Sequence, residues 1–156
     1  MVSRFLNAIT EALHAEFGND YEIYTEDIEQ GLTPPCFLVD LVTATREKQG
    51  ASWYMYSMVF SIQYFPSGDN ERKEIHNVLS RLDDCLEVIT VTWKDGQTDP
   101  KVNPEVKRTR TKVDEPAITE GVLTYPIRIS DVYYRVEDGD VMESADITVM
   151  EVLNHA

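Results

Sequence analysis

The chain has 156 residues, and its 14 Lys and Arg against 28 Asp and Glu give a formal net charge of −14 at pH 7. This length predicts a single domain, residues 1–156, with a real hydrophobic core. The charge argues against nucleic-acid binding through a basic surface and against docking on anionic membranes. No apolar run approaches the roughly 20 residues that span a bilayer, and the first residues lack the apolar segment of a signal peptide. With only Cys36 and Cys85 available for disulfides, we expect a protein of a reducing cytosol.

The first residues predict one helix and one short strand. Apolar residues three and four positions apart favour an amphipathic helix over residues 3–17, which Gly18 can end in the left-handed conformation. Residues 21–25 alternate and are rich in strand-forming types, which indicates a strand. Residues 26–35 contain a Pro-Pro pair, so we expect a loop there.

A long hairpin follows, with strands predicted over residues 36–48 and 52–65 and a turn between them. Alternate positions of the second strand are apolar, which is typical of a sheet with one buried face. These residues are Tyr54, Tyr56, Met58, Phe60, Ile62 and Tyr64. Residues 53–56, at the tip of the hairpin, are apolar on both faces.

The second half of the chain predicts a helix and then strands. Residues 70–90 hold a helical apolar period, with acidic residues in the first turn that suit a helix start. A loop is expected through residues 94–104. Because Pro126 cannot donate to a sheet, we expect an edge or bulge position for it. Strands are predicted over residues 106–115, 121–135 and 147–152.

These elements give the order α-β-β-β-α-β-β, with room for one more strand. One antiparallel sheet with a long hairpin and two helices packed on one face would bury all the apolar stripes. The predicted fold class is therefore α+β.

The sequence offers little support for a catalytic, metal or cofactor site. His14, His76 and His155 are scattered and form no ligand pair with a metal-binding spacing. No glycine-rich motif that cradles a phosphate occurs. Cys85 follows two aspartates, whose charge would raise the pKa of a thiol, and this disfavours a cysteine nucleophile. We therefore expect no enzyme and no cofactor.

Two features indicate contact with other protein chains. The first is a basic run that contains Lys107, Arg108, Arg110 and Lys112, whereas residues 11–30 carry seven acidic residues and no Lys or Arg. Such separation of charge can orient association between copies or with a partner. The alternative is a charged edge strand that discourages aggregation.

The second feature is the aromatic hairpin tip, formed by Trp53, Tyr54, Met55 and Tyr56. Aromatic residues and Met are enriched at the centres of interfaces. The alternative is a tip that packs over the core of its own domain. Together with the basic run, these residues are the candidate interface.

Several stretches of the chain resemble a known family. They are the opening FLNAITEAL from Phe5, the run YTEDIEQGL from Tyr24, Pro35-Cys36-Phe37, IQYFP from Ile62 and VYYR from Val132. These stretches are similar to the tail terminator, or tail completion, proteins found in tail gene clusters of phages and prophages of Gram-positive bacteria. The resemblance spans most of the chain and is weakest over residues 90–120.

This resemblance implies a structural virion protein, assembled in the cytoplasm of the bacterial host. Such a protein forms a ring, usually of six copies, that caps the growing tail tube, stops its polymerisation and presents a surface to the head-side connector. The implied partners are further copies, the tail tube protein and the connector. Genomic DNA would pass through an acidic lumen without specific binding, and no membrane is involved.

Two other functions stay open at this point. A head-completion or neck protein that bridges portal and tail would also form a ring, but would bind the portal side first. A small cytosolic enzyme or regulator would act as a monomer, with turnover or ligand binding.

Overall fold

The computed structural model describes residues 2–25, 31–51, 53–68, 71–92 and 106–134. Two α-helices, a single turn of 3-10 helix and eight strands lie in this part of the chain. In order they are α1 (Val2–Phe17), η1 (Gly18–Asp20), β1 (Glu22–Tyr24), β2 (Cys36–Lys48), β3 (Trp53–Phe65), α2 (Glu71–Cys85), β4 (Val88–Thr92), β5 (Val106–Arg110), β6 (Lys112–Val113), β7 (Ala117–Thr119) and β8 (Val122–Tyr134). The predicted strand at 147–152, the loop at 94–104 and His155 lie outside the described residues.

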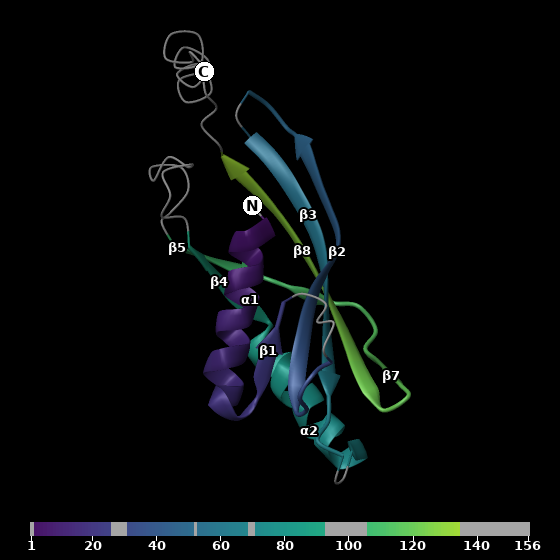
Figure 1. Ribbon diagram of the computed structural model, residues 1–156. Coiled ribbons are helices and arrows are strands. Elements are labelled where there is room, and N and C mark those ends of the chain that lie inside the picture. Colours follow the sequence, from purple (N-terminus) through teal and green to yellow (C-terminus); the bar gives the residue numbers. More distant parts are fainter. Residues whose placement is uncertain (1, 26–30, 52, 69–70, 93–105, 135–156) are drawn as a thin grey trace.

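The three 13-residue strands β2, β3 and β8 form an elongated sheet, and the helices with β4 lie on one side of it (Figure 1). The strand order is β1-β2-β3-β8-β6, and β7 also pairs with β8. The predicted α+β class, with its long hairpin and helices on one face, is confirmed. The sheet is mixed rather than purely antiparallel, because β1 pairs in parallel with β2. Strands β4 and β5 form a separate two-stranded sheet.

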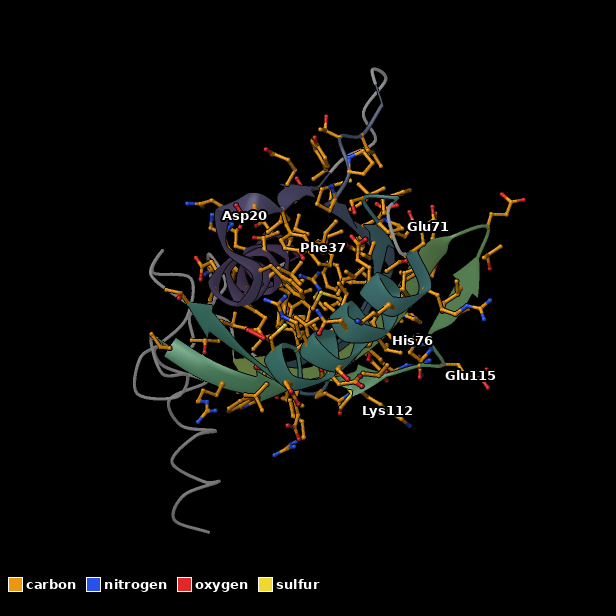
Figure 2. The ribbon with its side chains drawn as sticks, turned by 90° about the horizontal axis from the view of Figure 1, so that it is seen from below. Asp20, Phe37, Glu71, His76, Lys112 and Glu115 are labelled. Atoms are coloured by element: carbon orange, nitrogen blue, oxygen red, sulfur yellow. The ribbon has the colours of Figure 1, made fainter. Side chains whose placement is uncertain are left out.

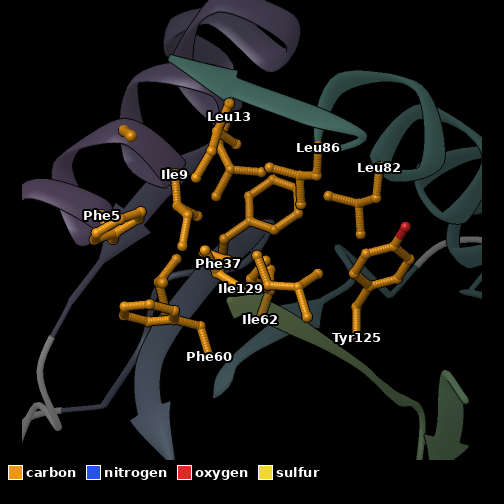
Figure 3. Packing of buried hydrophobic residues seen from close by; sticks show 14 of the residues in the cluster. Phe5, Ile9, Leu13, Phe37, Phe60, Ile62, Leu82, Leu86, Tyr125 and Ile129 are labelled. Carbon is orange, nitrogen blue, oxygen red and sulfur yellow. The ribbon is translucent and has the colours of Figure 1, made fainter. Parts of the chain in front are cut away.

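The core lies between this sheet and the helices. The alternation predicted for the hairpin is confirmed, since every second residue of β3 from Tyr54 to Tyr64 is buried. Buried residues of β8, such as Tyr125 and Ile129, continue the same face, and Phe5, Ile9 and Leu13 of α1 pack over it (Figure 3). Each apolar side chain buried in this way contributes about 1.5–3 kcal/mol of transfer free energy.

The helix predicted over residues 70–90 is shorter in the structure. It ends at Cys85, and the residues from Val88 to Thr92 form β4. Leu86 and Ile89 are buried, as either a helix or a strand would require, so the apolar spacing alone could not separate the two structures. The β-branched run Val-Ile-Thr-Val-Thr explains the outcome, because such side chains lose χ1 freedom in a helix and pack well on a sheet.

The strand predicted over residues 106–115 is divided into β5 and β6 at Thr111. Its hydroxyl donates to the carbonyl of Leu86, and its amide donates to the carbonyl of Glu87 at 3.0 Å. These bonds fix the chain at the point where its pairing partner changes from β4, which pairs with β5, to β8, which pairs with β6.

Pro126 lies in β8, which has strands on both sides, rather than at the edge or bulge that the sequence predicts. One side of β8 pairs with β6 up to Ile127 and then with β7 from Thr124, so the pairing breaks opposite Pro126. The carbonyl of Pro126 accepts from the amide of Asp114 at 3.0 Å on that side. Since the N and C=O of a strand residue point to the same side, the missing N–H faces the break, where no partner is lost.

Candidate assembly surfaces

The aromatic hairpin tip is largely packed against its own domain. Tyr54 and Tyr56 are 5% and 6% exposed and belong to the core cluster, whereas Trp53 and Met55 are half-buried. The guanidinium carbon of Arg46 lies 4.7 Å from the ring centroid of Tyr54. Trp53 and Met55 alternate with these tyrosines along β3, so they lie on the opposite face of the sheet, where they are only partly exposed.

The basic run is not one continuous strand face. Arg108 and Arg110 are exposed on one side of β5, Lys107 is half-buried on the other, and Lys112 is exposed on β6. Lys107 Nζ lies 3.0 Å from Asp131 Oδ2, and Arg110 pairs with Glu87 at 3.2 Å. Within the described part of the chain, Arg108 and Lys112 make no ion pair. The charge that is left for a partner is thus smaller than the sequence suggests.

The acidic stretch lies around the C-terminal half of α1 and β1. Glu11, Asp20 and Glu22 are exposed, and Glu11 and Glu22 line a shallow groove between α1 and β1 together with His14. Figure 2 shows Asp20 and Lys112 on opposite sides of the core residue Phe37. These two residues, one from the acidic stretch and one from the basic run, thus lie apart, whereas Lys107 and Arg110 of the basic run each have a carboxylate beside them. Residues 26–30 of the acidic stretch lie outside the described residues.

Two buried tyrosines connect α2 to the sheet. The hydroxyl of Tyr64 donates to Glu74, which also accepts from the amide and hydroxyl of Ser67 at 3.0 and 2.9 Å. The hydroxyl of Tyr125 donates to Asp83 at 2.6 Å. Burial, followed by the bonded carboxylate, raises the pKa of both phenols, so they stay protonated as donors. For Glu74, partial burial opposes ionisation, but the hydrogen bonds from Tyr64 and Ser67 prevail and lower its pKa.

The two cysteines are not activated as nucleophiles. Burial, with a smaller effect of Glu22, raises the pKa of the Cys36 thiol to about 11. Burial, with the nearby carboxylates of Glu16 and Asp84, raises the pKa of Cys85 to about 12. Both thiols are therefore protonated and unreactive at neutral pH. No cluster of three metal-ligating side chains occurs in the described ranges, and no helix there is long and apolar enough to cross a membrane.

Within the part of the chain that the structure describes, the sheet has an open edge that the sequence did not predict. Strand β1 pairs only with Cys36–Leu38 of β2, and from Asp40 onward every residue of β2 is exposed. Leu41 and Val42 are 37% and 57% exposed. Their adjacency, which breaks the alternation of the strand, was the one available signal.

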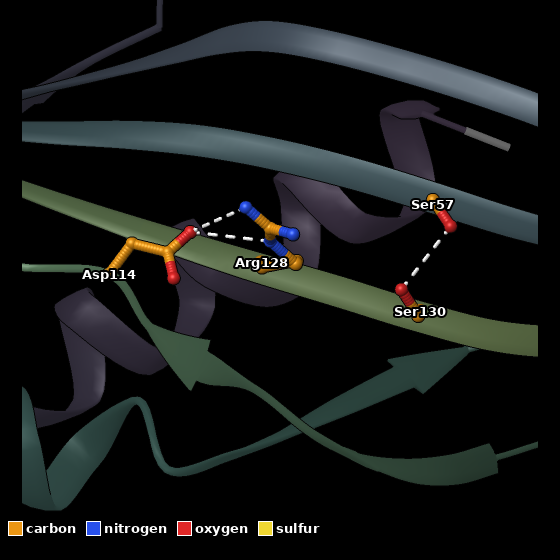
Figure 4. Close-up of polar contacts among 4 residues, drawn as sticks. All are labelled: Ser57, Asp114, Arg128 and Ser130. Carbon is orange, nitrogen blue, oxygen red and sulfur yellow. Dashed lines mark hydrogen bonds and ion pairs between the residues drawn. The ribbon is translucent and has the colours of Figure 1, made fainter.

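The face of the sheet turned away from the helices is mixed, because hydroxyls and an ion pair alternate there with partly buried apolar residues such as Met55 and Val59. Thr45 donates to the carbonyl of Ser57 on the neighbouring strand. The hydroxyls of Ser57 and Ser130 lie 3.2 Å apart, and Arg128 pairs with Asp114 at 3.0 Å (Figure 4). This face therefore combines hydroxyls, one ion pair and partly buried apolar side chains.

These observations describe a domain with a packed core, unreactive thiols and surfaces suited to contact with other chains. No curated protein matches the sequence. The model of the family described as phage tail terminator protein matches residues 4–140, which is most of the chain. The protein therefore belongs to the phage tail terminator family, a family of structural virion proteins.

Proposed function

We propose that the protein assembles as a ring of six copies that caps the tail tube, stops its polymerisation and joins the tail to the head connector. The observation that carries this proposal is the family match over residues 4–140. The unreactive thiols and the surfaces rich in unpaired strand edge and charge support a role in assembly rather than in catalysis.

The partner surface of this ring is formed by the hairpin tip and the basic run. Trp53 and Met55 supply partly exposed apolar area on the face of β3 opposite Tyr54 and Tyr56. Arg108 and Lys112 supply positive charge, and Arg110 lies beside them in an exposed ion pair with Glu87, whereas Lys107 is engaged by Asp131. This surface binds the tail tube protein, and the opposite end of the ring receives the connector.

The strong acidity fits a ring through which DNA passes. Six copies at −14 each carry −84, so the phosphate backbone finds no net attraction to the ring as a whole. Genomic DNA can then move through the lumen without specific binding, and the protein resides in the virion tail.

Deletion of the gene in a phage that can be induced tests this function. Loss of the terminator gives abnormally long or headless tails in electron micrographs, and expression of the protein from a plasmid restores normal length. Tails of normal length together with unstable heads would instead identify a head-completion or neck protein. Purified protein added to polymerising tube protein should arrest growth, whereas an enzyme or regulator would leave tube length unchanged.

A further inference from the structure

We infer that neighbouring copies join edge to edge, the distal part of β2 in one copy (Thr43–Lys48) pairing with β7 of the next. This inference rests on the proposed ring and identifies the contact that would close it. Among the described residues, the two segments lie at opposite edges of the same sheet, since β2 has no strand partner on its outer side beyond Leu38 and β7 pairs only with β8.

Both edges have exposed backbone and exposed apolar side chains. All three residues of β7 and all of β2 from Asp40 to Lys48 are exposed. Four large hydrophobic residues are exposed in the described part of the chain, and three of them lie on these two edges: Leu41, Val42 and Ile118. Unpaired N–H and C=O groups beside exposed aliphatic side chains form a template for another strand.

The features that usually protect an edge do not block this one. A bulge separates Leu41 from Thr43, but from Thr43 to Lys48 the pairing of β2 with β3 is regular. Thr43, Ala44 and Thr45 are small, so another backbone can approach closely. Arg46 and Lys48 extend over the ring of Tyr54, at 4.7 and 6.0 Å from its centroid, on one face of the sheet rather than across the edge.

Charge identifies the occupant of the β2 edge as β7 of a second copy. Glu115 and Glu120 lie just before and after β7, and both are exposed. Because β7 has three residues, a carboxylate lies near Arg46 or Lys48 wherever β7 pairs along Thr43–Lys48. Because Glu47 stands exposed between the two basic residues, Thr43–Lys48 carries a net charge of +1. In a chain with a net charge of −14, this segment offsets part of the repulsion between copies when it faces the acidic edge.

The topology also fixes the direction of pairing. Within one copy β2 and β7 run in opposite directions, because each of the pairings β2–β3, β3–β8 and β8–β7 is antiparallel. If the helix-covered face stays on the same side from copy to copy, β7 pairs antiparallel with the neighbouring β2. Two different edges that meet in this way make a head-to-tail contact, which closes into a ring when the rotation per copy permits.

Reciprocal charge reversal tests this contact. The first variant is Arg46→Glu with Lys48→Glu, and the second is Glu115→Lys with Glu120→Lys. Native mass spectrometry and electron microscopy, with and without purified tube protein, measure the assembled fraction. We expect each variant alone to lose about tenfold or more of its ring, because like charges then meet at every contact.

An equimolar mixture of the two variants should restore rings with an even number of copies in alternation. Each acidic β2 edge then meets a basic β7 edge, and each wild-type β2 edge meets a wild-type β7 edge. Restoration also shows that both variants fold. The second variant further controls for overall charge, because it makes each copy less negative and would assemble better if only general repulsion mattered.

Several outcomes would overturn the edge contact. Rings that persist in both single variants would mean that other surfaces join the copies, or that residues 135–156 cover the edge. A wild-type dimer that depends on Arg46 and Lys48 but not on Glu115 and Glu120 would indicate β2–β2 pairing. A wild-type protein that stays monomeric both alone and with tube protein would overturn the proposed ring as well as the edge contact. A ring that forms regardless of the charges at Arg46, Lys48, Glu115 and Glu120 would overturn the edge contact alone.

Discussion

Substitution of Phe60 by Ala tests the packing between the hairpin and the helices. Phe60 is 0% exposed and lies in the middle of the core face of β3 (Figure 3). Truncation of a buried Phe to Ala costs about 3–5 kcal/mol, from lost transfer free energy and from the cavity that remains. Since domains of this kind are stable by about 5–15 kcal/mol, this one change removes a large part of the total. For a chain of this length it lowers Tm by on the order of 10 °C.

The matched control is Ser61→Ala, the next residue of the same strand. Ser61 is half-buried on the opposite face, and a substitution there should change stability by less than about 0.5 kcal/mol. Urea unfolding followed by circular dichroism gives the free energy of unfolding of each variant. Similar m-values for the two variants and the wild type show that the differences between these free energies reflect stability. A loss below about 1 kcal/mol for Phe60→Ala, or equal losses for both variants, would refute the assignment of the two faces.

Four further predictions follow from the same structure. Glu74→Gln should remove part of the acid sensitivity of the domain. Because the pKa of Glu74 is lowered in the folded state, its contribution to stability is present above the pKa of the unfolded state, near 4.3, and is lost as the pH falls through the pKa of the folded state. Urea unfolding at a series of pH values between about 3 and 7 measures this loss. Tyr125→Phe removes the bond to Asp83 and should cost about 1–2 kcal/mol in urea unfolding, while Asp83→Asn, which keeps an acceptor, should cost less. EDTA should leave Tm unchanged, and a fall of several degrees would reveal a metal site. Arg108→Glu with Arg110→Glu should leave the circular dichroism spectrum and the ring intact but abolish binding to tube protein in pull-down assays, and undiminished binding would identify the run as a solvated edge.

The local pattern of the chain predicted those elements whose burial depends on nearby residues. The alternation from Tyr54 to Tyr64 is produced by the strand itself, and one covered face is enough to explain it. The end of α2 was harder to predict, because Leu86 and Ile89 suit both a helical and a strand period. Only the branched side chains of β4 distinguish the two structures, and they act through pairing with β5, which begins at Val106.

The candidate site shows the same limit more strongly. Whether Lys107 or Arg110 is available to a partner depends on Asp131 and Glu87, which lie 24 and 23 positions away in the chain and meet them only in the folded state. Likewise, the open edge of β2 exists because β1, its parallel neighbour, has three residues and β2 has thirteen. No periodicity within residues 36–48 encodes the length of a neighbouring strand.

The separation of these surfaces gives the acidity of the chain a physical role. Exposed ion pairs contribute only about 0–1 kcal/mol each. A few such pairs per contact are therefore too weak to hold strongly negative copies in a ring, and backbone pairing and apolar burial must act with them. The edges of β2 and β7 combine all three contributions, whereas Arg108 and Lys112 offer charge alone. Copies would then be held by strand pairing and apolar burial in addition to charge, so salt would affect the contact between copies less than a contact made by charge alone. Binding through the basic run would depend strongly on ionic strength, and this difference in salt dependence separates the contact between copies from the contact with the tube.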